Sequence, residues 1–251
     1  MGVFVHEVWE PTAARRGTIV LLHGAMAAAS TWWRIGPALA EHGWQVHAVD
    51  LPGHGSAARF AGRFTMDRFA ALTADRLPDG IDLLVGHSLG AVVGLLVAAR
   101  RLRPVSALVL EDPPDEAPAA AVPAPVDRDA ALRRVRTSNP AWAEQDVVHA
   151  VDSAFAVDSD GFTAALATQP RWDLAGLVAS AGLPTMVLAP PTGTGGALSA
   201  ARPALRALVG PQRFVELDGG HCAHRACPEL WLAAVIAFAD QVLPVSDSGH
   251  A

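Results

Sequence analysis

A serine between two glycines, together with its flanking segments, constrains this sequence most. The segment Gly86-His87-Ser88-Leu89-Gly90 follows the apolar run DLLV and precedes the small-residue run AVVGLLVAA. This order predicts a buried strand, a sharp turn and a buried helix. The glycines remove the Cβ atoms that would collide with the neighbouring chain in such a turn. We therefore predict that Ser88 Oγ is exposed at a strained turn, at a helix start where unpaired N–H groups favour developing negative charge.

Strand patterns alternate with helical patterns along most of the chain. Short runs of Val, Leu and Ile bounded by Gly and Pro, with helical patterns between them, indicate parallel strands joined by crossover helices. The predicted strands are Phe4–Trp9, Thr18–Leu22, Gln45–Val49, Asp82–Val85, Ala107–Leu110, Thr185–Leu188 and Arg213–Leu217. The predicted core helices are Trp32–His42, Met66–Leu77, Ser88–Leu102, Pro203–Val209 and Pro228–Val242. The predicted fold class is α/β, with a mostly parallel central sheet flanked by helices.

An insertion interrupts this alternation after Leu110. The stretch PPDEAPAAAVPAP holds neither a helix nor a strand ladder and indicates a connector. Short helices are predicted beyond it at Asp127–Arg136, Pro140–Phe155 and Gly161–Leu166. We predict a core formed by residues 1–112 and 183–251, a helical cap at residues 113–182, and a disordered tail from Pro244.

Composition excludes several kinds of function. The net charge is −6 and the arginines are scattered singly or in pairs, so we expect no nucleic acid partner and no membrane partner. The sequence contains no lysine and no tyrosine, which excludes a Lys Schiff base and a Tyr proton donor. The most apolar stretch, residues 81–99, contains Asp82, His87, Ser88 and three glycines, and is therefore a poor membrane span.

The first residues and the cysteines predict the compartment. Glu7 and Glu10 stand where a signal peptide needs an unbroken apolar region. The two cysteines, in the run HCAHRAC at residues 221–227, are too few for a disulfide framework and suit a reducing compartment. The spacing of that run fits no zinc pattern, so we expect no metal and no cofactor. We expect a cytoplasmic protein, and its oligomeric state stays open.

Four motifs together resemble the α/β-hydrolase superfamily. They are GHSLG at residues 86–90, LLHGA at 21–25, DLPGHGS at 50–56 and GGH at 219–221, in the order found in that family. The resemblance implies the α/β-hydrolase fold with a helical cap inserted after the sixth core strand, and Ser88 as the nucleophile. His221, which follows the predicted last strand and a Gly-Gly hinge, is then the general base, with His224 as the fallback. The N–H groups of Ala25 and Leu89 are the implied oxyanion donors.

The acid of the triad is where the sequence departs from the commonest family pattern. That pattern places an Asp in the loop after the strand TMVL, but this loop reads APPTGTGGALSA and contains no carboxylate. The second location in the family, at the end of the preceding strand, holds Glu111 and Asp112. Alternation along a strand allows only one of them to face His221, and we favour Asp112, with Glu111 as the alternative. A capping role for the acidic pair and a Ser-His dyad stay open.

Aromatic residues of the cap and of the segment after LLHGA predict an apolar substrate pocket. The candidates are Trp32, Trp33, Trp142, Phe155 and Trp172, with packing as the alternative role for each. The expected reaction is hydrolysis of an ester, thioester or lactone with a mainly apolar small-molecule acyl group, through an acyl-enzyme. Two alternatives remain. One is a non-hydrolytic reaction on this fold, namely acyl transfer, a lyase step or a cofactor-free oxygenase step, and the other is a catalytically decayed small-molecule receptor.

Overall fold

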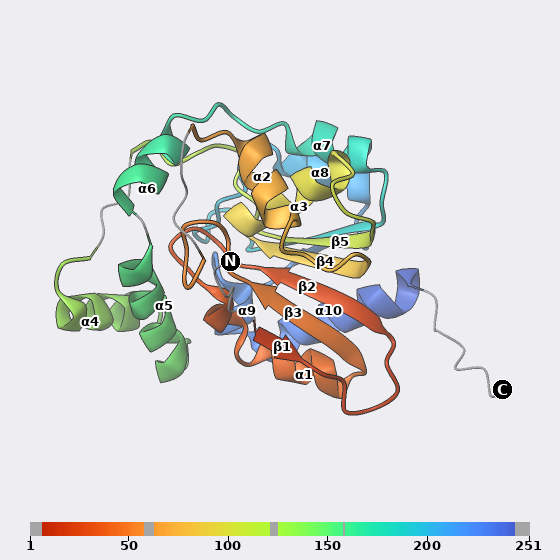
Figure 1. The fold of residues 1–251 in the computed structure, drawn as a ribbon, viewed down its shortest axis with the longest axis horizontal. Coiled ribbons are helices and arrows are strands. Elements are labelled where there is room, and N and C mark those ends of the chain that lie inside the picture. Colours follow the sequence, from red (N-terminus) through yellow and green to blue (C-terminus); the bar gives the residue numbers. More distant parts are fainter. Residues whose placement is uncertain (1–6, 58–62, 121–124, 158, 244–251) are drawn as a thin grey trace.

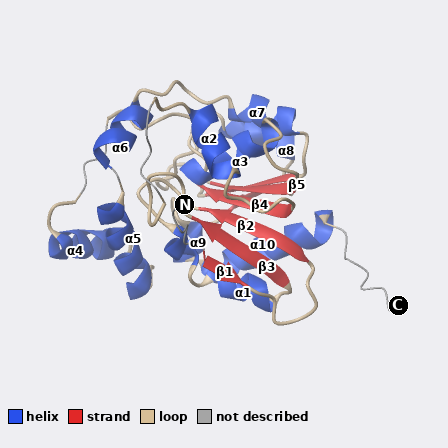
Figure 2. Ribbon diagram, viewed as in Figure 1, coloured by secondary structure: helices blue, strands red, loops and turns tan. Residues whose placement is uncertain are grey.

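A computed structural model describes residues 7–57, 63–120, 125–157 and 159–243 of the 251-residue chain. Seven strands form one sheet in the order β1-β3-β2-β4-β5-β6-β7 (Figures 1 and 2). Their bounds are β1 Glu7–Trp9, β2 Gly17–Leu22, β3 Trp44–Val49, β4 Ile81–His87, β5 Val105–Glu111, β6 Thr185–Ala189 and β7 Phe214–Glu216. Only β1 runs antiparallel to its neighbour, β3. The predicted α/β class with a mostly parallel sheet is therefore confirmed.

Helices cover both faces of this sheet (Figure 1). One apolar core contains α2 (Met66–Ala74), α3 (Leu89–Ala99), α7 (Leu174–Ala181) and α8 (Arg202–Val209). A second core, on the other face, contains the 3-10 helix η1 (Ala29–Trp32), α1 (Ile35–Glu41), α9 (Ala223–Ala226) and α10 (Pro228–Val242). The inserted helices α4 (Arg128–Ser138), α5 (Glu144–Ala156) and α6 (Ser159–Ala167) gather on one side of the molecule, away from α7 and α8.

The central position of β4 and α3 follows from their composition. The side chains of β4 are almost all buried, as expected of a parallel strand that is covered on both faces. Ten of the eleven residues of α3 are buried, so this helix is apolar around its whole circumference and not along a single stripe. Gly94 lets α3 approach β4, because a Cβ there would lie 3.2 Å from Leu84 Cδ2. The turn between these two elements is thus held on a rigid, buried base.

The structure corrects several predicted boundaries. The helix predicted over Trp32–His42 is divided into η1 and α1, because Pro37 has no N–H and fits only the first turn of a helix. The helix α7 was not predicted, although it lies inside the predicted cap, and it packs on α3 and α8. The insertion follows β5, which is the fifth described strand in chain order and not the sixth. The predicted strand residues 4–6 and the tail from Pro244 lie outside the described residues.

None of the helices within the described ranges is both long enough and apolar enough to cross a bilayer. The longest of them, α10, has 15 residues.

Candidate active site

Ser88 lies at the turn between β4 and α3, in a strained backbone conformation. Its φ of 53° and ψ of −120° are rarely adopted by a residue with a side chain. The flanking glycines make this turn possible, because a Cβ on Gly86 would lie 2.4 Å from the Gly90 oxygen. A Cβ on Gly90 would lie 2.4 Å from the Leu22 oxygen. Ser88 is half-buried and directly precedes the first turn of α3, so its side chain has access to a helix N-terminus.

The turn after β2 lies directly against this serine. A Cβ on Gly24 would come within 3.1 Å of Ser88 Cβ, so only glycine allows so close an approach. His23 fixes the turn, because its Nδ1–H donates to the Gly24 oxygen at 2.7 Å and its Nε2 accepts from Leu51 N–H at 2.9 Å. Within the described part of the chain, the N–H groups of Ala25 and Leu89 donate to no protein oxygen. Both predicted oxyanion donors are thus left available for a ligand.

His221 and Asp112 come together across 109 residues of sequence. His221 Nδ1 lies 2.5 Å from Asp112 Oδ2, and the side chain of His221 stays 36% exposed while that of Asp112 is 1% exposed. With its Nδ1–H donated to the carboxylate, the imidazole keeps Nε2 free to accept a proton. His87 links this pair to the elbow, since its Nε2–H donates to the His221 backbone oxygen at 2.8 Å. The preferred acid of the sequence analysis therefore contacts the preferred base.

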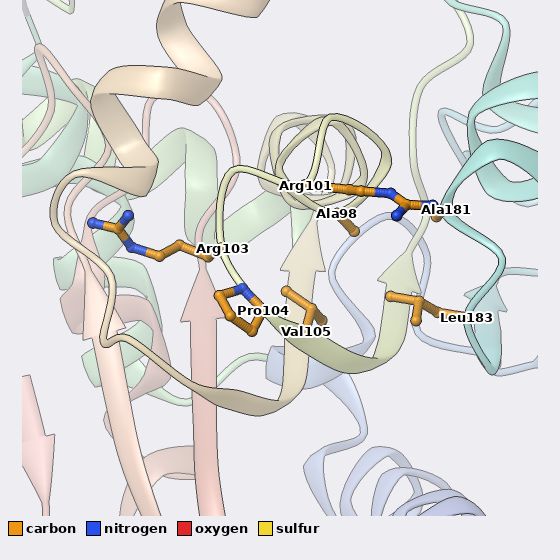
Figure 3. A pocket seen from close by; sticks show the side chains of 7 residues that line it. All are labelled: Ala98, Arg101, Arg103, Pro104, Val105, Ala181 and Leu183. Atoms are coloured by element: carbon orange, nitrogen blue, oxygen red, sulfur yellow. The ribbon is translucent and has the colours of Figure 1, made fainter.

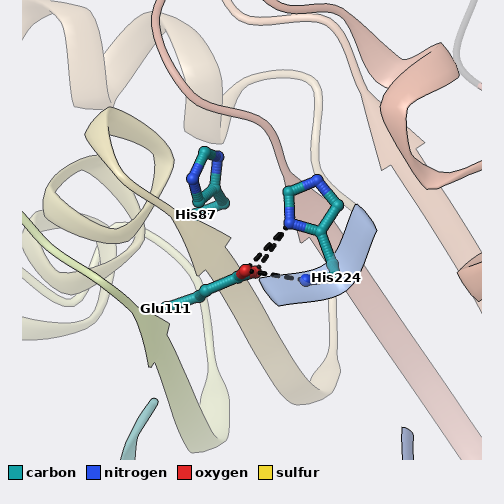
Figure 4. Close-up of side chains that lie close together, drawn as sticks. All are labelled: His87, Glu111 and His224. Atoms are coloured by element: carbon teal, nitrogen blue, oxygen red, sulfur yellow. Dashed lines mark hydrogen bonds and ion pairs between the residues drawn. The ribbon is translucent and has the colours of Figure 1, made fainter. Parts of the chain in front are cut away.

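Glu111 and His224, the two fallback residues, contact each other instead (Figure 4). His224 donates to the Glu111 carboxylate from its backbone N–H at 3.0 Å and from Nδ1 at 2.9 Å. Trp231 Nε1 donates to the other oxygen of Glu111 at 3.0 Å. Thr31 Oγ1 lies 3.0 Å from His224 Nε2 and also accepts two hydrogen bonds from Arg225. All of these groups are buried, so this second acid-histidine pair braces the loop that carries His221.

The same buried cluster is the place where the described side chains could hold a metal ion. Atoms of His87, Glu111 and His224 that can ligate a metal all lie within 4.8 Å of one another. Each residue, however, already uses at least one of these atoms in a hydrogen bond within the protein, as given above. Burial raises the pKa of the Glu111 carboxyl and lowers the pKa values of His87 and His224 well below the usual range. The geometry thus favours a buried hydrogen-bonded brace over a metal centre.

The sequence matches the alpha/beta hydrolase family over residues 19–235, a range that runs from the third residue of β2 to the middle of α10. The chain belongs to the alpha/beta hydrolase family.

Curated relatives of this chain are esterases and a lipase at modest identity. The pimeloyl-[acyl-carrier protein] methyl ester esterase of Cronobacter sakazakii is 38% identical over 101 residues, which are 40% of this chain and 38% of that protein. Lipase LipV of Mycobacterium tuberculosis is 34% identical over 139 residues, which are 51% of this chain and 52% of that protein. The matches thus span between about two fifths and one half of each relative.

Solved structures share the fold over nearly the whole length of the chain. The enol-lactonase of Burkholderia xenovorans superimposes with a TM-score of 0.73 at 19% identity, covering 94% of this chain and 96% of that chain. The thioesterase domain from the curacin biosynthetic pathway gives a TM-score of 0.69 at 21% identity, with 92% and 94% covered. At such identities the likeness shows the fold alone.

The aromatic residues predicted to line a substrate pocket lie in different environments. Trp32 is fully buried, and its ring packs against His224 and Trp231 with centroids 4.4 and 5.9 Å apart, so the structure makes it a core residue and not a pocket residue. Trp172 is half-buried and packs against the core of α2 and α3. Phe155 is 41% exposed on α5. The structure does not bring these three side chains together.

Trp33 and Trp142 lie where the inserted segment, which carries α4 and α5, contacts the core. Trp33 Nε1 donates to the buried carboxylate of Asp146 on α5 at 2.9 Å. The Arg225 guanidinium, four residues after His221, lies 4.6 Å from the centre of the Trp142 ring. The sequence analysis missed Asp146 and Arg225, and no motif marks either residue. Both tryptophans therefore connect the inserted segment to the segments that flank the predicted catalytic groups.

A cavity at the opposite end of the parallel strands, where β5 begins, is unrelated to this site (Figure 3). It has a volume of about 360 Å³ and lies where β5 begins, whereas Ser88 follows the end of the parallel strand β4. Its lining residues are Ala98, Arg101, Arg103, Pro104, Val105, Ala181 and Leu183. Figure 3 shows the Arg103 side chain pointing away from that of Arg101, so the two guanidinium groups do not converge on one ligand.

Four buried histidines around the site predict sensitivity to acid. Burial lowers the pKa values of His23, His87 and His224, and lowers the pKa of His54 to about 3. Each lies below the unfolded value of 6.5, so the unfolded chain binds more protons as the pH falls below about 6.5, and stability is lost. For each proton that only the unfolded chain binds, the loss is about 1.4 kcal/mol per pH unit, and the raised pKa of Glu111 partly offsets it at lower pH.

Urea unfolding at pH 7.5, 6.5 and 5.5 measures this loss. We expect the urea midpoint to fall steeply between pH 6.5 and 5.5. In His54→Gln, the free energy of unfolding should depend less steeply on pH, by the equivalent of about one bound proton. His42→Gln, at an exposed position, is the matched control and is expected to leave the slope unchanged. A flat profile would show that the four histidines are not held neutral.

Proposed function

We propose that this chain is a serine hydrolase that cleaves an ester, thioester or lactone of a mainly apolar small-molecule acyl substrate. Ser88 is the nucleophile, His221 the general base and Asp112 the acid of the triad. The observation that carries the proposal is the contact of 2.5 Å between His221 Nδ1 and the buried Asp112 carboxylate, beside a serine held in a strained turn. A buried carboxylate that orients a half-exposed imidazole is the arrangement that serine hydrolases require.

The proposed reaction has two halves. In the first, His221 Nε2 accepts the proton of Ser88 Oγ as the oxygen attacks the carbonyl carbon, and the imidazolium then protonates the leaving group. The N–H groups of Ala25 and Leu89 donate to the oxyanion, each contributing about 3 kcal/mol to transition-state stabilisation. In the second half, His221 activates a water molecule that releases the acyl group and restores Ser88. Every step uses protein groups and water, and we propose no cofactor.

The acyl class is supported by the relatives and by the surroundings of the site. The relatives act on a methyl ester or are named as a lipase, and the structural neighbours include a thioesterase domain and an enol-lactonase. Leu89 and Met26 belong to an apolar cluster that reaches Phe162 on α6. An apolar acyl group leaving water for such surroundings gains about 25 cal/mol for each Å² of apolar surface that it buries.

Covalent labelling tests the nucleophile without knowledge of the natural substrate. We expect a fluorophosphonate to add to the folded protein with one-to-one stoichiometry, and peptide mass spectrometry to find the adduct on Ser88. A p-nitrophenyl ester should then show a burst of nitrophenol equal to the enzyme concentration if deacylation is slow. Labelling that is absent, or that is spread over several serines at the rate seen in urea, would exclude the mechanism and favour a receptor.

A further inference from the structure

Two aspartates follow β5 at a spacing of three residues, and both hold the same glycine-rich loop. Asp112 and Asp115 are 1% and 3% exposed. The loop, residues 190–201, is the one in which the commonest family pattern places the acid, and here it contains no carboxylate. Its contacts with the two aspartates indicate what it contributes instead.

Asp112 receives its orientation from the backbone of this loop. Ala197 N–H donates to Oδ2 at 2.7 Å and Leu198 N–H donates to Oδ1 at 3.0 Å. Oδ2 is also the oxygen that accepts from His221 Nδ1, so the two amides fix the rotation of the carboxylate plane relative to the imidazole. Asp112 itself has a φ of 41°, a conformation that needs such outside support.

Asp115 holds the next residues of the loop in the same manner. Its Oδ1 accepts from Ser199 Oγ at 2.9 Å and its Oδ2 accepts from Ala201 N–H at 2.8 Å. The backbone oxygen of Asp115 accepts from Trp172 N–H at 3.0 Å, so the main chain of Asp115 is held by the segment that precedes α7. Leu198, whose N–H donates to Asp112, has its side chain buried in the apolar core that also contains residues of α7 and α8.

We propose that Asp115 is a positioning residue for the triad, acting through Ser199, Ala201 and the amides of Ala197 and Leu198 on Asp112. This inference rests on the proposed function, because it assigns a task only if Asp112 orients His221. The loop supplies N–H donors from residues 197 and 198 in place of a carboxylate, and Asp115 keeps these donors at the distance that Asp112 needs. A displacement of about 1 Å in a supporting group costs up to about 100-fold in rate.

Kinetics of Asp115→Asn and Ser199→Ala with a p-nitrophenyl ester test the inference. We expect kcat to fall about 10-fold in Asp115→Asn and about 3-fold in Ser199→Ala, with KM changed less than about 2-fold, because the inference assigns both residues to the orientation of Asp112 and not to ester binding. Asp82→Asn is the matched control: Asp82 also accepts a backbone N–H, from Thr18 at 2.7 Å, but at the start of β4. We expect Asp82→Asn to leave kcat unchanged.

A double-mutant cycle separates positioning from general destabilisation. In the Asp112→Asn background, we expect Asp115→Asn and Ser199→Ala to lower kcat no further, because the group that they position is already lost. An equal fall in both backgrounds, or a wild-type kcat in folded Asp115→Asn and Ser199→Ala, would overturn the inference. If Asp115→Asn does not fold, Ser199→Ala decides. Wild-type turnover by Asp112→Asn alone would instead refute the proposed triad.

Discussion

The substitution Ser88→Ala is expected to lower kcat/KM for p-nitrophenyl esters by about 10⁴-fold to 10⁶-fold. The reason is that no other group can form the acyl-enzyme at the end of β4, so only the oxyanion donors and substrate binding remain. Alanine keeps the Cβ that already occupies a φ of 53°, so the strain of the elbow is unchanged. The urea unfolding midpoint should therefore match that of the wild type, which assigns the loss to chemistry and not to folding.

The matched control for this experiment is Ser106→Ala, an exposed serine near the opposite end of the same sheet. Its kcat/KM should stay within about 2-fold of the wild-type value, since surface substitutions of this kind have small effects. A Ser88→Ala variant that retains more than about a tenth of the wild-type activity would mean that a different nucleophile, or water alone, attacks the ester.

The sheet and the elbow could be predicted because local sequence determines them. Residues 83–85 form a short apolar run, Leu-Leu-Val, as expected of a strand that is buried on both faces of a parallel sheet. The glycines at 86 and 90 have no freedom to change, because a Cβ at either one would overlap backbone atoms. Such constraints act over ten residues or fewer, and a sequence shows them directly.

The helix α7, which was not predicted, also has local signals at both of its ends. Asp173 accepts from Gly176 N–H at 2.9 Å as the N-cap, and Gly182 ends the helix with a φ of 64°. An aspartate before and a glycine after an apolar run is the usual mark of a short helix. The Pro/Ala-rich connector upstream led the whole segment to be assigned to the cap.

The roles of Trp32 and of the two acids could not be predicted from local sequence. Trp32 and Trp33 are adjacent, and which of them faces the core depends on the single turn of η1 that precedes α1. Similarly, the directions of Glu111 and Asp112 depend on where β5 ends, because residue 111 still pairs with β6 while Asp112 turns away at a φ of 41°. These outcomes depend on the positions of His221 and His224, more than 100 residues away.

The second large effect is expected from Asp112→Asn, which should lower kcat by about 10³-fold to 10⁴-fold. An asparagine keeps the shape but presents an amide that can face His221 Nδ1 with N–H, which favours the imidazole tautomer that cannot accept the Ser88 proton. It also lacks the negative charge that stabilises the imidazolium. Stopped-flow and steady-state measurements with one p-nitrophenyl ester provide kcat, and labelling by a fluorophosphonate should slow in parallel.

Glu111→Gln is the neighbouring control, because it removes the same charge one residue earlier. Glu111 contacts His224 and Trp231 and not His221, so we expect kcat to stay within about 10-fold of the wild-type value. The free energy of unfolding should fall instead, by about 1–3 kcal/mol, because a glutamine cannot satisfy all the buried donors that the carboxylate accepts from. If kcat falls 10³-fold in Glu111→Gln and barely changes in Asp112→Asn, then Glu111 is the acid, and the loop of His221 rearranges during turnover.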